Sequence, residues 1–108
     1  MSESLVPNDV NLELFKYSSF AETFTFSYAT TSYTYYAQIR DDEDTLIESF
    51  NIVNSTPNVT ISLTRAEIAL LNEGTYIWSL KEVHTADTDE RMICTGRVFI
   101  KDNPTQTP

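Results

Sequence analysis

The sequence predicts an all-β protein, an antiparallel sandwich or barrel of seven or eight short strands with one short helix. Three observations predict this fold. Apolar side chains recur at every second position through most of the chain, which is the pattern of strands with one buried face. Turn-forming residues separate the runs at intervals of about 8–12 residues, as in all-β sandwiches and barrels. A single helix-start signal interrupts the alternation.

Alternating runs mark the expected strands, and β-branched and aromatic residues dominate them, as a half-buried pleated surface prefers. The runs lie at 10–15, 23–28, 35–40, 46–53, 58–63, 76–81 and 92–100. Turn-forming residues gather at 29–33, 41–45, 54–57 and 84–90. In the last run one set of alternate positions shares a face that should be buried. This set is Met92, Cys94, Gly96, Val98 and Ile100.

The predicted helix lies near 64–72. Thr64 and Glu67 have the spacing of a capping box, in which each side chain bonds the other residue's backbone amide. Apolar residues follow, and Gly74 is the expected C-cap, because glycine adopts left-handed backbone angles without steric cost.

The core should centre on Trp78, which alternates with Tyr76 and Leu80 in one strand. Ile39 occupies the equivalent inward position of an earlier strand. Gly96 should leave room for a bulky neighbour across the core.

The chain should form one domain at 10–101, flanked by polar arms at 1–9 and 102–108. Both arms are expected to become ordered only when a neighbour holds them. No run reaches the length of a membrane span, and no signal peptide is expected at the N-terminus.

Composition argues against most enzymes and metalloproteins. The chain has one cysteine, Cys94, and one histidine, His84. A single cysteine excludes an internal disulfide or a cysteine-cluster metal site, and no activated nucleophile accompanies His84. We therefore expect no catalytic residues, no resident metal and no cofactor. The acidic loops at 41–44 and 87–90 are expected to be solvated turns, with a weak cation site as the alternative.

The charge balance bears on partners. The chain has 16 acidic and 7 basic residues and a formal net charge of −9. The basic residues are scattered, so nucleic acid and anionic membranes are not expected partners.

Three aromatic residues are candidates for a protein interface. Phe15, Tyr36 and Phe99 lie out of phase with the apolar faces of their strands. If their strands are neighbours, these side chains should form a patch of the kind that marks interfaces. Acidic residues should surround the patch and favour a partner that presents Lys or Arg. An outward tyrosine can also stack on a sugar, which keeps carbohydrate binding as an alternative.

The order of the strand motifs resembles a known family. The motifs are Ala37-Gln38-Ile39-Arg40, then Leu63-Thr64 followed by the helix, then Gly74-Thr75-Tyr76-Ile77-Trp78-Ser79-Leu80, and finally Gly96-Arg97-Val98-Phe99-Ile100. Over roughly residues 10–103 this series resembles the small immunoglobulin-like β-sandwich virion proteins of tailed bacteriophages, and is similar to the N-terminal domain of the baseplate upper protein.

The resemblance implies an immunoglobulin-like sandwich and a non-enzymatic structural role in the virion. Such a protein would act as an adaptor or repeated module in the tail, baseplate or neck. Its partners would be other virion proteins and copies of itself. A capsid decoration protein, a carbohydrate-binding module and a small hydrolase remain as alternatives.

Overall fold

The structure is a computed structural model, and it describes residues 8–102. The described chain forms eight strands and one short helix. In chain order they are β1 (Leu12–Phe15), β2 (Phe20–Thr25), β3 (Tyr33–Arg40), β4 (Leu46–Ser49), β5 (Asn51–Ser55), β6 (Asn58–Leu63), α1 (Arg65–Ala69), β7 (Gly74–His84) and β8 (Glu90–Lys101). No helix within this range is long and apolar enough to cross a membrane.

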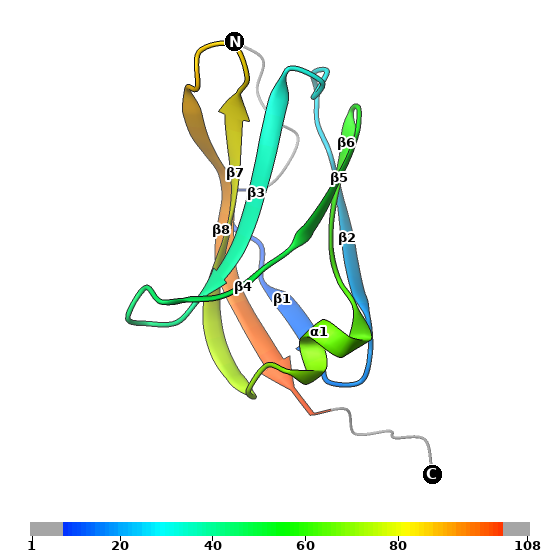
Figure 1. Cartoon of the computed structure of the whole chain (residues 1–108), viewed down its shortest axis with the longest axis vertical. Coiled ribbons are helices and arrows are strands. Elements are labelled where there is room, and N and C mark those ends of the chain that lie inside the picture. Colours follow the sequence, from blue (N-terminus) through cyan, green and yellow to red (C-terminus); the bar gives the residue numbers. More distant parts are fainter. Residues whose placement is uncertain (1–7, 103–108) are drawn as a thin grey trace.

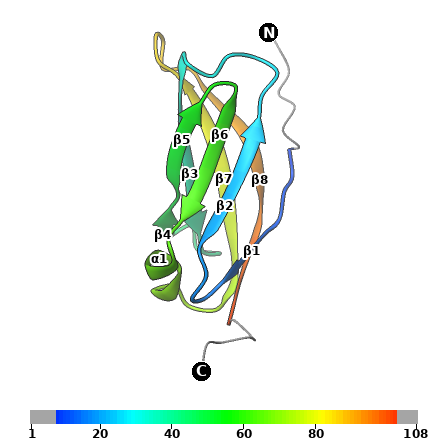
Figure 2. The same ribbon diagram turned by 90° about the vertical axis from the view of Figure 1, so that its right-hand side faces the viewer.

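The strands form two sheets that face each other across one core (Figures 1 and 2). The larger sheet has the order β1-β8-β7-β3-β4, and the smaller has the order β2-β6-β5. The predicted all-β fold is confirmed, and of the two architectures left open by the sequence the chain adopts the sandwich.

One strand pair departs from the antiparallel prediction. β1 runs parallel to β8, with Leu12 opposite Val98 and Leu14 opposite Ile100. The chain reaches this position because its preceding residues are already bound to β8. The Val10 amide donates to the Thr95 carbonyl at 3.0 Å. The strand pairings other than β1–β8 are antiparallel.

The run predicted as one strand at 46–53 belongs to both sheets. β4 pairs with β3, whereas β5 pairs with β6. Phe50 lies between them, and its amide donates to the Ala37 carbonyl at 2.8 Å. Its buried ring packs edge-on against Trp78, with centroids 6.1 Å apart. Burial of this aromatic ring thus fixes the point where the chain crosses between the sheets.

The core surrounds Trp78, as predicted from its strand position. Trp78, Leu80 and Ile39 are fully buried. The indole stacks on Phe24 at a centroid distance of 6.0 Å. Tyr76 is only partly buried at the margin of the core, and its hydroxyl donates to the Asn72 carbonyl at 2.9 Å.

Gly96 makes room for the bulky Trp78, which lies opposite it in β7, and also for the backbone of Val10. A Cβ atom at this position would lie 1.9 Å from the Val10 carbonyl oxygen. The same oxygen accepts a hydrogen bond of 2.7 Å from the Trp78 indole nitrogen. The missing side chain therefore lets the chain entering β1 satisfy the one polar atom of the largest core residue.

A β-bulge in β8 reverses one predicted orientation. Leu80 lies opposite Cys94, but the next residue, Lys81, lies opposite Met92. Ile93 is the extra residue, and it is buried, while Met92 is 58% exposed. The prediction that Met92 shares the buried face of Cys94 is wrong, because one inserted residue shifts the alternation.

The capping box is confirmed at the start of α1. Thr64 Oγ1 accepts from the Glu67 amide at 3.1 Å, and Glu67 Oε1 accepts from the Thr64 amide at 2.8 Å. The helix is shorter than expected, since its C-cap is Leu70. Gly74 is not the cap. It begins β7 with a φ of 151°, a value that favours glycine.

Two edge strands each carry a carboxylate that opposes pairing with a further strand. Glu22 of β2 and Glu48 of β4 lie at inward-phase positions, opposite the buried residues Ile61 and Ile39. Charges at such positions oppose pairing with a further strand. Contacts with other molecules are therefore more favourable on the sheet faces than on these edges.

The predicted arms fall mostly outside the described residues, which exclude 1–7 and 103–108. Of the N-terminal arm, Asn8 and Asp9 are described, and both pair with Thr95 of β8.

Candidate interaction face

The outer face of the five-stranded sheet carries all three predicted interface aromatics, but in two separate places. Phe15 and Phe99 are half-buried on β1 and β8. Tyr36 is 49% exposed on β3. Phe99 lies opposite Thr75 of β7 and Tyr36 lies opposite Lys81 of the same strand. Six residues of strand span roughly 20 Å, so the three rings do not form one patch.

A groove crosses the strands between these two places. Its floor includes Ser79 and Gln38, which lie opposite each other on β7 and β3, and Thr95 of β8 is next in the same row. Outward residues follow at every second position of a strand, so a further row of side chains lies on each side of this floor. These two rows form the walls of the groove. One wall is Met92, Lys81 and Tyr36, and the other is Arg97, Ile77 and Arg40.

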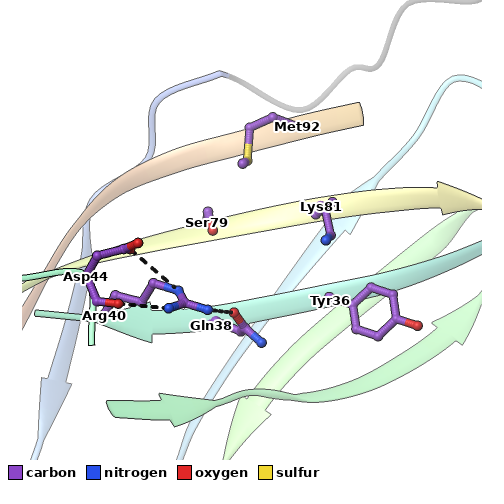
Figure 3. A pocket seen from close by; sticks show the side chains of 7 residues that line it. All are labelled: Tyr36, Gln38, Arg40, Asp44, Ser79, Lys81 and Met92. Atoms are coloured by element: carbon purple, nitrogen blue, oxygen red, sulfur yellow. Dashed lines mark hydrogen bonds and ion pairs between the residues drawn. The ribbon is translucent and has the colours of Figure 1, made fainter. Parts of the chain in front are cut away.

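The main hollow of this groove has a volume of about 540 Å³, within the range of ligand pockets. Figure 3 shows Gln38 and Ser79 at its floor, with Tyr36 and Arg40 at opposite ends. The Arg40 guanidinium donates to the Gln38 amide oxygen and to the Asp44 backbone carbonyl, both at 2.9 Å. These bonds fix the guanidinium against the floor.

The loop between β3 and β4 continues the groove outward. A second hollow of about 220 Å³ lies between this loop and the sheet. Asp41, Asp42 and Asp44 line it on one side, and Ile77 and Ser79 line it on the other. The acidic loop thus stands as a ridge beside the groove.

The charges on this face differ from the expected arrangement. The outward positions of β3, β7 and the Met92–Lys101 part of β8 carry four cations and no carboxylate. They are Arg40, Lys81, Arg97 and Lys101. The acidic rim is present, but its carboxylates pair with cations of the same face. Arg97 is the one cation of this set with no ion pair within residues 8–102.

Three surface ion pairs make up this rim. Glu90 lies 2.7 Å from Lys81, Glu13 lies 3.1 Å from Lys101, and Asp44 lies 3.8 Å from Arg40. Exposed pairs of this kind contribute little to stability. A partner carboxylate can therefore replace them at small cost.

Ile77 and Met92 are half-exposed members of this face that sequence reasoning missed. Ile77 was detectable, because it alternates with Trp78 and must point outward if Trp78 points inward. Met92 was not detectable, because only the bulge at Ile93 turns it outward.

A buried polar cluster occupies the end of the sandwich near the 84–90 loop. Glu82 of β7 is 3% exposed and points inward, in phase with Leu80. The Tyr28 and Tyr35 hydroxyls each donate to Glu82 Oε2 at 2.7 Å. Arg91 lies 3.1 Å from Oε1 and also donates to the Tyr28 hydroxyl. Every oxygen of the carboxylate thus has a partner, as a buried charge requires.

This environment suppresses ionisation of the phenols. Burial, followed by the hydrogen bond to Glu82, holds the pKa of Tyr28 and of Tyr35 well above its ordinary value of 10. Tyr35 is buried, and Tyr28 is half-buried beside it. The sequence did not identify Glu82, because it occupies a core position that a period-two pattern assigns to an apolar residue.

His84 and Cys94 are not arranged for catalysis. His84 Nδ1 bonds Asp87 Oδ1 at 2.9 Å, and its ring packs on Tyr33 with centroids 5.2 Å apart. Cys94 is buried, and burial raises the pKa of its thiol to about 11. A thiol with so high a pKa is a poor nucleophile near neutral pH.

The two acidic loops lie at opposite ends of β7 and do not combine. In the 84–90 loop the Asp89 amide, followed by the His84 ring, lowers the pKa of Asp87. In the 41–45 loop Asp41 Oδ1 accepts from the amides of Glu43 and Thr45 at 2.9 Å. Both arrangements are turn-forming. Within residues 8–102 no group of three or more His, Cys, Asp or Glu residues could hold a metal ion.

Known proteins resemble this chain in fold and not in sequence. No protein-family model matches it, and no curated protein matches its sequence. An Ig-like domain from human cDNA superposes with a TM-score of 0.51 at 10% identity, covering 100% of this chain and 85% of that chain. An Ig complex of titin M10 with obscurin-like 1 gives 0.52 at 9% identity, with coverage of 94% and 95%.

The fold is an immunoglobulin-like β-sandwich. CopC from Methylosinus trichosporium OB3b is similar to the same extent, with a TM-score of 0.53, 10% identity, and coverage of 89% and 90%. Identities this low show a shared fold and no shared function.

Proposed function

We propose that this chain is a non-enzymatic structural protein of a bacteriophage virion, an adaptor or repeated module in the tail, baseplate or neck. The supporting observation is the location of the residues that carry the family resemblance. Their three main motifs lie on β3, β7 and β8. These are neighbouring strands of one sheet, so the resembling residues build a single continuous surface and the core beneath it.

A non-enzymatic role fits the chemistry of the described residues. The ionisable groups at the buried end of β7 are engaged in hydrogen bonds that join Glu82 of β7 to Tyr35 of β3 and to Tyr28 of the β2–β3 connection. His84 is paired within a turn, and Cys94 is enclosed. Nucleophilic catalysis needs a base next to an accessible nucleophile, and these residues provide no such pair.

The proposed work of the protein is contact through the outer face of the five-stranded sheet. Tyr36, Ile77 and Met92 leave about half of their side-chain surface exposed there. Aromatic residues and arginine are enriched among the residues that dominate binding energies. Glu22 and Glu48 disfavour assembly by strand pairing at the β2 and β4 edges.

Particle incorporation tests the proposal. The chain should be present in gradient-purified phage particles at the stoichiometry of a structural component, measured by quantitative mass spectrometry. The Tyr36→Ser/Phe99→Ser double variant should fold normally and be depleted from particles. Val53→Ser is the matched control, because Val53 is 58% exposed on the other sheet. Absence of the wild-type chain from particles refutes the proposal, and normal incorporation of the double variant refutes the contact face.

Two further experiments separate the alternatives. Immunogold labelling of the head instead of the tail would identify a capsid decoration protein. The groove beside Tyr36 also has the aromatic ring and planar polar groups that saccharides use. Binding of the purified chain to a glycan array, lost in Tyr36→Ser, would favour a carbohydrate-binding module.

A further inference from the structure

The hairpin loop at 41–45 projects from the outer face of the five-stranded sheet (Figure 1). Hydrogen bonds hold it in one shape. The Asp44 amide donates to the Asp41 carbonyl at 3.1 Å, and the Asp41 side chain accepts the amides of Glu43 and Thr45. The side chains of Asp42, Glu43 and Asp44 are exposed. The loop therefore offers a preformed ridge with four consecutive carboxylates.

The groove beside this ridge has the opposite charge. Arg40 and Lys81 line its main hollow, and Arg97 lies in the outward row that contains Ile77 and Arg40. Arg40 and Lys81 have surface carboxylates nearby, at 3.8 and 2.7 Å. No described residue forms an ion pair with the Arg97 side chain. The groove can therefore take additional negative charge.

The same face thus carries an acidic ridge and a basic groove next to each other. A surface with adjacent complementary halves can bind itself about a two-fold axis, since the axis places each ridge against the partner's groove. We propose that two copies of this chain pair through these outer faces, with the 41–45 hairpin of each copy lying in the groove of the other. The pairing specifies the partner at the contact face proposed above.

Apolar contacts would contribute to this pairing as well as charge. Tyr36, Ile77 and Met92 stand on the groove walls with about half of their surface exposed. Burial of such side chains gives affinity, while complementary charge sets orientation and speeds encounter.

The opposite face of the domain lacks these features. The outward residues of the smaller sheet are mainly Thr, Ser and Asn, including Thr23, Thr60 and Thr25, which bond across strands. A second copy should therefore bind only through the larger sheet, giving a closed dimer and no longer chain of subunits.

Charge reversal tests the pairing on purified protein. Sedimentation velocity should show a concentration-dependent dimer for the wild type. Asp42→Lys/Glu43→Lys reverses the ridge, and Lys81→Glu/Arg97→Glu reverses the groove. In a dimer of either variant alone, the ridge of one copy would face a groove of the same charge. The association constant of each variant should therefore fall by about tenfold or more. An equimolar mixture of the two variants restores both complementary contacts and should form a heterodimer.

Glu22→Lys/Asp89→Lys is the matched control. It makes the same change in formal charge as the ridge variant, at exposed positions away from the groove. This control should dimerise like the wild type. Equal loss of dimer in the control, or failure of the mixed variants to associate, overturns the proposal.

The result also separates this proposal from the virion role. A wild-type chain that stays monomeric to millimolar concentration overturns the pairing and leaves the groove to an acidic segment of another protein. If that monomeric chain is still found in particles, the virion role stands. A dimer that never enters particles would support the pairing and refute the virion role.

Discussion

Replacement of the buried carboxylate, Glu82→Gln, should destabilise the domain far more than a similar change at the surface. The side chain keeps its size, but it loses its charge and presents an NH₂ donor among groups that already donate. Tyr28, Tyr35 and Arg91 all donate to the native carboxylate. Removal of one partner from a buried ion pair typically costs about 3–5 kcal/mol.

The lower end of this range applies, because the Arg91 side chain is one-third exposed and water can solvate it. We expect a loss of about 3 kcal/mol, a large part of the roughly 5–15 kcal/mol that stabilises a domain. Urea unfolding at neutral pH, followed through the fluorescence of the single buried tryptophan, Trp78, measures this loss as a lower midpoint at unchanged slope.

Glu90→Gln is the matched control, because Glu90 forms an exposed ion pair with Lys81. This change should cost less than about 1 kcal/mol. Tyr35→Phe should cost about 1–2 kcal/mol, since it removes one donor and leaves the carboxylate with fewer partners. Combined with Glu82→Gln, its effect should be less than additive. If Glu82→Gln costs no more than Glu90→Gln, the cluster does not stabilise this end of the sandwich.

Further predictions concern the backbone, the helix start and the response to alkali. Gly96→Ala should destabilise the domain strongly, since the added Cβ would lie 1.9 Å from the Val10 carbonyl oxygen. Displacement of this oxygen would leave the Trp78 indole nitrogen without its acceptor, which alone costs roughly 1–3 kcal/mol. A wild-type thermal midpoint would contradict this. Thr64→Ala should cost about 1 kcal/mol by urea unfolding. The Thr64 amide, first of several donors, lowers the pKa of Glu67, so the contribution of the Glu67 carboxylate is present above its unfolded pKa and is lost as acid protonates the folded carboxylate. Glu67→Ala should therefore cost less stability at acid than at neutral pH, and equal losses would count against this carboxylate. Above pH 10 stability should fall with rising pH, because the raised pKa of Tyr35 lets its phenol ionise first in the unfolded state; Tyr35→Phe should flatten this fall in pH-dependent urea titrations, and an unchanged slope would exclude the mechanism.

The sequence by itself determined the local structure of this protein. Alternation of apolar residues identified most strands, and the position of Trp78 identified the centre of the core. The capping box located the helix start to the residue, since Thr64 and Glu67 bond each other within one turn. These features depend on neighbours within a few positions, so a single sequence contains the information they need.

Tertiary structure alone decided how distant segments meet. The parallel position of β1, the sheet crossing at Phe50 and the bulge at Ile93 each depend on a partner in another strand. The outward turn of Met92 follows from that bulge. The same holds for Glu82, whose inward position is tolerated only because Tyr35 of β3, Arg91 of β8 and Tyr28 of the β2–β3 connection converge on it. The groove arises likewise from the register of three strands, which places Thr95, Ser79 and Gln38 in one row between two other outward rows. Alternation within one strand says which side chains share a face, but only pairing between strands sets which of them become neighbours.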